Sequence, residues 1–172
     1  FFYYISNHSL KITKLENHMD EKLSTRKLIF LDFDGVLIYG NKYEGFSKDK
    51  LILLGEILEK TEADIIVSSS WRSDLRKTKE LLRDTDNVLT GGEVFPYISH
   101  IKGVTPHLTH FDKHGEPDGP ATRGEEIEGF LQNNPCYQYV VLDDSEQMLP
   151  KQRKHWVLVD DKIGLSETDA VR

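Results

Sequence analysis

Four short runs of consecutive apolar residues divide the chain, and they constrain its fold more than any other feature. The runs are Leu28–Leu31, Ile65–Val67, Tyr139–Leu142 and Trp156–Val159. Consecutive apolar residues, unlike alternating ones, are typical of strands that are covered on both faces. Helix-like segments lie between these runs, so the sequence favours an α/β domain with a central, mostly parallel sheet flanked by helices.

The segments between the strands contain helix signals of different strength. Leucines spaced three and four residues apart predict a helix from 47 to 60, and a second helix is predicted from 73 to 83. A third helix is predicted to start after Thr122, because Glu125 three residues later completes a capping-box pattern. The segment 90–121 is rich in Gly, Pro and His, and we expect it to be irregular.

Two aspartates follow the first apolar run. Asp32 and Asp34 are two residues apart, so in extended chain they point to the same side while Phe33 turns into the core. Gly35 then allows the backbone to turn sharply. Parallel sheets bind their ligands at the carboxyl ends of their strands, so both aspartates are candidate catalytic residues. The alternative is that they only form a turn or cap a helix.

A second acidic pair, Asp143 and Asp144, follows the third apolar run. If the two strands are neighbours, up to four carboxylates converge. Two like charges 4 Å apart repel by about 4 kcal/mol at an effective dielectric constant near 20, so such a cluster needs a counter-ion. Mg²⁺ prefers oxygen ligands and is the natural cation for phosphate chemistry. The alternative is a loop in which Ser145 caps a helix.

Hydroxyl and guanidinium groups complete the candidate site. Ser68 and then Ser69 follow the second apolar run and offer hydrogen bonds to a phosphoryl oxygen. Arg123 lies in the first turn of a predicted helix, where the helix dipole disfavours a cation, and a phosphate bound there would explain its position. The alternative is that Arg123 pairs with Glu126 or Glu128.

Other polar residues support weaker interpretations. Trp71 could stack on a nucleic-acid base, although packing at the rim of the core is the commoner role for such a residue. Arg72 and nearby basic residues could contact a nucleic-acid end, but the basic stretch 72–83 is more simply explained as a solvated helix face. Four histidines between 100 and 114 have no cysteine partners, so a zinc site is not expected.

In chain order, DFDGV at 32–36, VSSS at 67–70, Arg123 and LDD at 142–144 resemble the motifs of the haloacid dehalogenase-like (HAD) superfamily. The chain is still more similar to the HAD domain of Swiss Army Knife RNA repair proteins. That likeness rests on SSSWR at 68–72, GVTP at 103–106, RGEEI at 123–127 and GLSETDA at 164–170. It covers nearly everything after residue 27.

The resemblance implies a three-layer Rossmann-like fold and a residue-by-residue mechanism. Asp32 would be the nucleophile, and Asp34 would be the general acid and base. Mg²⁺ would be held by Asp32, the main-chain carbonyl of Asp34, and the pair of Asp143 and Asp144, of which Asp144 aligns with the usual direct ligand. Phosphoryl oxygens would be bound by Ser68 or Ser69 and by Arg123. Superfamily members more often have Lys in place of this arginine, which makes Lys102 the fallback.

The resemblance also limits the substrate. Only about 33 residues separate Asp34 from Ser68, so no large cap domain fits between them. Uncapped members of this superfamily tend to act on large substrates, and the RNA-repair likeness points to a 3′- or 2′-phosphate at an RNA or DNA end. The alternatives are a phosphatase acting on nucleotides or sugar phosphates, and a non-catalytic phospho-acceptor or interaction domain.

Composition sets the remaining expectations. Residues 1–26 are interpreted as an N-terminal extension of uncertain role, and residues 27–172 as the catalytic domain. No apolar run approaches the roughly 20 residues of a membrane span, so we expect no membrane association. Cys136 is the sole cysteine, which excludes an intrachain disulfide and is compatible with a cytoplasmic location. No haem or nucleotide cofactor is expected.

Overall fold

The computed structural model describes residues 26–39, 45–89, 96–136 and 138–171. Its centre is a five-stranded parallel sheet with the strand order β3-β2-β1-β6-β7. The strands are β1 (Lys27–Leu31), β2 (Asp64–Val67), β3 (Ile101–Val104), β6 (Gln138–Asp143) and β7 (Trp156–Leu158). All four strands predicted from the apolar runs are present, and the predicted α/β class is confirmed.

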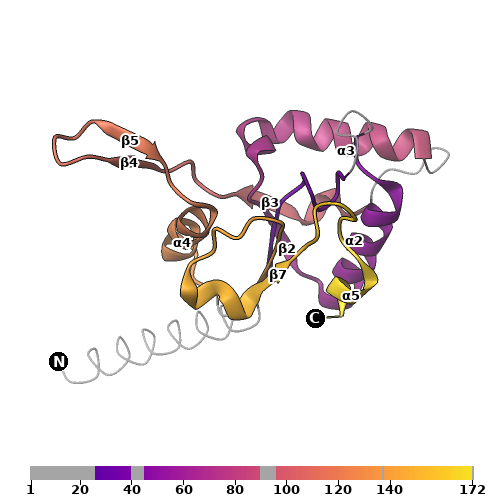
Figure 1. Ribbon diagram of the computed structural model, residues 1–172. Coiled ribbons are helices and arrows are strands. Elements are labelled where there is room, and N and C mark those ends of the chain that lie inside the picture. Colours follow the sequence, from indigo (N-terminus) through magenta and orange to yellow (C-terminus); the bar gives the residue numbers. More distant parts are fainter. Residues whose placement is uncertain (1–25, 40–44, 90–95, 137, 172) are drawn as a thin grey trace, which may run out of the picture.

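Helices cover both faces of this sheet (Figure 1). They are α2 (Lys48–Thr61), α3 (Leu75–Leu89), α4 (Arg123–Asn133) and the short α5 (Glu167–Ala170), with 3₁₀ turns at Ser70–Asp74, Pro96–His100 and Pro150–His155. The second predicted helix therefore begins later and ends later than its sequence pattern indicated. The described residues contain no domain-sized cap.

The core consists of two clusters that alternate along β1. Ile29 and Leu31 pack with Leu54 and Leu58 of α2 on one face of the sheet. Leu28 and Phe30 belong to the second cluster, on the α4 side, which also contains Ile127 of that helix. Successive side chains of a strand point to opposite faces, so these two clusters define the three layers of the fold.

The start of α4 is fixed by the capping box that the sequence predicted. Thr122 Oγ1 accepts a hydrogen bond from the Glu125 N–H at 3.3 Å, and Glu125 Oε2 accepts one from the Thr122 N–H at 2.7 Å. Such caps stabilise a helix by roughly 1 kcal/mol and also define its first residue. As a result, Arg123 is the first residue of α4 and lies at the edge of the sheet where β1 and β6 end.

The prediction of an irregular segment over 90–121 is confirmed for the connections 105–108 and 112–116 but wrong for most other residues that the structure describes there. The segment also has regular structure. It contains the edge strand β3 and an antiparallel hairpin of β4 (Thr109–Phe111) and β5 (Pro117–Pro120). The hairpin projects away from the sheet on the side of α4 (Figure 1). Residues 90–95 and all of the expected extension except Arg26 lie outside the described residues.

Candidate active site

The candidate site lies at the carboxyl ends of the three central strands. Asp32 follows β1, Ser68 follows β2, and Asp143 ends β6. Main-chain hydrogen bonds align these ends: the Asp32 N–H donates to Leu142 O at 3.0 Å, and the Ser68 N–H donates to Leu31 O at 2.9 Å. Side chains that are about 110 residues apart in the sequence thus meet at one edge of the sheet, as expected for a parallel α/β sheet.

Three carboxylates form a compact cluster at this edge. Oxygen atoms of Asp32, Asp143 and Asp144 all lie within 4.8 Å of one another. Burial raises the pKa of Asp143 to about 7, and the neighbouring charge of Asp32 adds to this rise. The pKa of Asp32 is also raised, chiefly by burial, although the Arg123 guanidinium opposes the shift. Burial and the Asp32 charge raise the pKa of Asp144.

This donor set fits a hard divalent cation. Three carboxylate oxygens are close together, and their raised pKa values show that the protein alone does not compensate their charges. Mg²⁺ is bound in proteins by one or two such carboxylates together with water and phosphate oxygens. Gly35 is required beside the cluster, because it has a φ of 73° and a Cβ there would lie 2.2 Å from Asp144 Oδ2.

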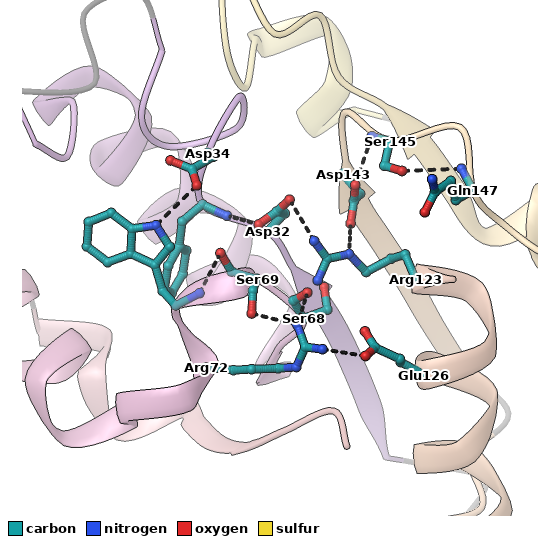
Figure 2. Close-up of polar contacts among 12 residues, drawn as sticks. Asp32, Asp34, Ser68, Ser69, Arg72, Arg123, Glu126, Asp143, Ser145 and Gln147 are labelled. Carbon is teal, nitrogen blue, oxygen red and sulfur yellow. Dashed lines mark hydrogen bonds and ion pairs between the residues drawn. The ribbon is translucent and has the colours of Figure 1, made fainter. Parts of the chain in front are cut away.

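Asp34 lies next to this cluster, but its carboxylate is not part of it. The indole N–H of Trp71 donates a hydrogen bond to Asp34 Oδ2 at 3.1 Å (Figure 2). The indole is itself held by edge contacts with Phe33 and by packing against Phe46. Trp71 therefore packs at the rim of the core, and it also orients the second aspartate of the Asp-x-Asp pair.

The groups predicted to bind phosphate surround Asp32. Arg123 Nη2 donates to Asp32 Oδ2 at 3.2 Å, and Arg123 Nε lies 3.1 Å from Asp143 Oδ2 (Figure 2). Arg123 thus pairs with the cluster rather than with the glutamates of its own helix. Arg123 Nη1 and the Ser68 hydroxyl are buried and have no hydrogen-bond partner among the described residues. Both atoms can therefore donate to an incoming oxyanion.

Ser69 has a different role from Ser68. A hydrogen bond from its hydroxyl lowers the pKa of Asp32. Its Oγ also accepts a hydrogen bond from the main-chain N–H of Trp71 at 3.4 Å. The Ser69 hydroxyl is therefore already engaged by the protein. Of the two serines predicted as phosphate ligands, Ser68 is the one whose hydroxyl remains available.

Arg72 does not contribute to an exposed basic surface. Its guanidinium is buried, forms an ion pair with Glu126 at 2.5 Å and donates to the main-chain oxygen of Ser69 at 2.9 Å (Figure 2). Arg72 is therefore engaged within the protein, and its contact with a nucleic-acid end stays a prediction. Arg72 instead connects the serine loop after β2 to α4, two elements that the sequence pattern did not link.

The fallback phosphate ligand and the histidines lie away from the carboxylate cluster or contact other groups. Lys102 is an exposed residue near the start of β3, whereas the site lies at the opposite ends of the strands. His100 contacts the Ala63 carbonyl, and His110 contacts Glu125. Within the described ranges, Asp32, Asp143 and Asp144 form the one group whose side chains are close enough together to hold a metal ion, and no histidine belongs to it.

Comparison with protein families matches residues 28–170 to the HAD domain in Swiss Army Knife RNA repair proteins. The match covers more than half of the chain, so this chain belongs to that family, which has the HAD fold and supports an enzyme of the hydrolase or phosphatase type in general. Comparisons with curated proteins and with solved structures gave no significant match. In the part of the chain that the structure describes, no helix has the length and apolar character needed to cross a membrane.

Proposed function

We propose that this domain is a Mg²⁺-dependent phosphomonoesterase that works through an aspartyl-phosphate on Asp32. One observation carries the proposal: the buried Asp32 carboxylate belongs to the carboxylate cluster and is paired with Arg123. Two buried donors at this edge of the sheet, Ser68 Oγ and Arg123 Nη1, have no partner among the described residues. A nucleophilic carboxylate needs a cation on one side and phosphate-binding donors on the other. The clustered carboxylates provide a site for the cation, and Ser68 and Arg123 provide the donors for the phosphate.

In the first step, a carboxylate oxygen of Asp32 attacks phosphorus, and the bond from phosphorus to the ester oxygen breaks. Asp34 gives its proton to that leaving oxygen as the alcohol departs. Ser68 and Arg123 bind phosphoryl oxygens during this transfer and offset their charge. In the second step, Asp34 takes a proton from water, and the water oxygen attacks phosphorus. Inorganic phosphate leaves, and the Asp32 carboxylate is restored.

Asp34 is suited to these two roles by its position. It is close enough to Asp32 for its charge to raise the Asp32 pKa, yet it lies outside the metal-ligand cluster. The hydrogen bond from Trp71 fixes the orientation of its carboxylate. A general acid and base must lie within reach of the transferred proton without being tied to the cation.

The side chains of Asp32, Asp143 and Asp144 would hold Mg²⁺, together with the main-chain carbonyl of Asp34 implied by the family. When bound, the cation would neutralise the carboxylates and allow a phosphate dianion to approach Asp32. The chain supplies the rest: Arg123 keeps Asp32 and Asp143 in place, and Gly35 leaves room for Asp144.

We propose 3′- or 2′-phosphates at the ends of RNA as substrates. The family to which the chain belongs is the HAD domain in Swiss Army Knife RNA repair proteins. In the part of the chain that the structure describes, no cap domain covers the site. A large substrate can therefore bring its terminal phosphate to the carboxyl edge of the sheet. A phosphatase acting on nucleotides or sugar phosphates is the competing possibility.

The experiment that tests this function is a phosphate-release screen with Mg²⁺ or with EDTA. It compares RNA and DNA oligonucleotides that carry 3′-, 2′- or 5′-phosphates with mononucleotides and sugar phosphates. We expect Mg²⁺-dependent release that is fastest from RNA with a 3′- or 2′-phosphate. Rapid turnover of mononucleotides without turnover of oligonucleotides would remove the repair assignment. A stable phosphoprotein without release would indicate a phospho-acceptor domain.

The pKa of Asp143 predicts how pH changes the stabilisation by Mg²⁺. In the metal-free protein this pKa is about 7, above its ordinary value of 3.8. The folded state therefore keeps a proton that the unfolded chain has lost, and the free energy of unfolding falls as pH rises through this window. Mg²⁺ needs the deprotonated carboxylates, so it should raise the melting temperature more at about pH 8 than at about pH 5.5.

Thermal unfolding with and without Mg²⁺ at the two pH values provides this measurement. Asp143→Asn is the matched control, because it keeps the side-chain shape but loses the titrating charge. It should show little response to Mg²⁺ at either pH. Equal shifts of the parent melting temperature at both pH values would show that Asp143 does not bind the cation.

A further inference from the structure

A pocket of about 400 Å³ lies beside Arg123. One wall is the base of the hairpin, with Leu108, Thr109 and Ala121, and the opposite wall is the loop after β6, with Ser145 and Gln147. The pocket is separate from the carboxylate cluster, because none of the three clustered aspartates lines it. A phosphate on Arg123 would therefore stand at one end of the pocket, and the group that carries the phosphate could enter it.

The hairpin wall is firmly attached to the catalytic core. Glu126, which pairs with Arg72, also accepts a hydrogen bond from the Leu108 N–H at 3.5 Å, and Arg72 Nη2 lies 3.0 Å from His107 Nδ1. The Ala121 N–H donates to the Leu108 carbonyl at 3.0 Å and closes the base of the hairpin. The buried ion pair thus joins this wall to the loop that carries Ser68.

The opposite wall is held just as closely against α4. The Gly124 N–H donates to the Gln147 carbonyl at 3.0 Å, and Gln152 Nε2 donates to the Gly124 carbonyl at 2.8 Å. A Cβ at Gly124 would lie 2.6 Å from the Leu149 nitrogen, so only glycine allows this approach. Gly124 directly follows Arg123, and the pocket therefore has a fixed distance from the phosphate-binding guanidinium.

The pocket lining indicates the chemical class of its occupant. Thr109 and Ser145 provide hydroxyls, Gln147 provides an amide, and Leu108 and Pro120 provide carbon surface. The paired side chains of Arg72 and Glu126 and the imidazole of His107 add polar groups to this lining. Such a lining can hydrogen-bond sugar hydroxyls and base edges while it packs against the face of a ring. The volume lies near the lower limit of roughly 300–1,000 Å³ for ligand pockets, which suits one nucleoside rather than several.

We propose that this pocket binds the terminal nucleoside that carries the phosphate, so that the hairpin base and the loop after β6 select a nucleotide end. The inference rests on the proposed phosphatase function and names the part of the substrate that this domain recognises. The rest of a nucleic-acid strand would lie outside the pocket, where the described residues place no cap over the site.

Binding measurements test this proposal without depending on turnover. The Asp32→Asn protein, in Mg²⁺, is titrated with uridine 3′-monophosphate and with inorganic phosphate by calorimetry. We expect the nucleotide to bind at least about tenfold more tightly, because it fills the pocket as well as the phosphate site. Adding Thr109→Trp places a large side chain in the pocket and should abolish this preference.

Asp118→Trp is the matched control, because it puts the same bulk on the neighbouring strand at an exposed position outside the pocket. It should keep the preference for the nucleotide. Gln147→Trp fills the pocket from the opposite wall and replaces Thr109→Trp if circular dichroism shows that the latter is misfolded. Equal affinities for nucleotide and phosphate, or a preference that survives both filling variants, would overturn the subsite.

The phosphate-release screen, run on chains that keep Asp32 with and without the pocket-filling substitutions, separates this outcome from failure of the proposed function. A nucleotide preference that is lost in the filled variants, with no phosphate release from any ester, would support the subsite and remove the phosphatase. Phosphate release from RNA ends that is unaffected by filling the pocket would support the phosphatase and remove the subsite.

Discussion

Replacing Asp32 by Asn is expected to slow phosphate release by about 10⁴- to 10⁶-fold, the scale on which loss of a nucleophile acts. Asn has the same shape as Asp but cannot attack phosphorus as a carboxylate does. The fold should remain intact, because Asp32 is buried and its pKa is already raised by that burial. Arg123 would still have Asp143 as a partner.

The measurement is the rate of phosphate release from the best substrate of the screen, with circular dichroism and thermal unfolding to verify the fold. Glu167→Gln, at an exposed position on α5, is a suitable control for the loss of a carboxylate and should leave the rate unchanged. A correctly folded Asp32→Asn protein with the parent rate would exclude Asp32 as the nucleophile.

Replacing Glu126 by Ala should lower the free energy of unfolding by roughly 3–5 kcal/mol, the usual cost of leaving one member of a buried ion pair without its partner. The side chains of Arg72 and Glu126 are only 6% and 8% exposed. The pKa of Arg72 is lowered, chiefly by burial, and Glu126 opposes that shift. Without Glu126 the guanidinium would stay buried without its ion-pair partner, and only the weaker attraction of Asp32 would offset its charge.

Urea unfolding of the two proteins measures this difference. Glu128→Ala is the matched control on the same helix, since Glu128 pairs with the largely exposed Lys151. Lys151 is exposed and Glu128 is partly exposed, so solvent weakens this pair and the variant should lose much less stability than Glu126→Ala. If Glu126→Ala costs no more than Glu128→Ala, Arg72 and Glu126 do not brace the serine loop and the hairpin.

The sheet and its acidic edge could be predicted from the sequence because their signals are local. Continuous apolar residues mark β1 and β6 as buried strands, and Asp32 and Asp143 directly follow or end them. In a parallel sheet, adjacency of two strands is enough to bring the residues at their ends together. The capping box at Thr122 likewise fixed the start of α4 from a four-residue pattern.

The bracing contacts could not be predicted, because they depend on tertiary packing. Arg72 and Glu126 are 54 residues apart, and each lies in a charged stretch that is typical of a solvated helix face. Trp71 and Asp34 are 37 residues apart, and no spacing rule connects an indole to a carboxylate. The motif SSSWR does place Trp71 and Arg72 next to the serines, which is the one signal that pointed to them.

β3 and the hairpin were missed for a different reason. β3 has the sequence IKGV, in which Lys102 and Gly103 interrupt the apolar run, as an edge strand with an exposed side allows. The hairpin strands are exposed along almost their whole length, and prolines begin and end β5. Without a buried face they lack the alternation by which strands are recognised.

The central claim is that phosphate passes through a covalent bond to Asp32, and trapping this intermediate tests it most directly. Asp34→Asn protein should be phosphorylated by an aryl phosphate, whose leaving oxygen needs little protonation, but should hydrolyse the intermediate slowly for want of a base. After quenching and borohydride reduction, peptide mass spectrometry should find homoserine at position 32. Phosphate release with position 32 unmodified, or with the modification at another residue, would contradict the proposed mechanism.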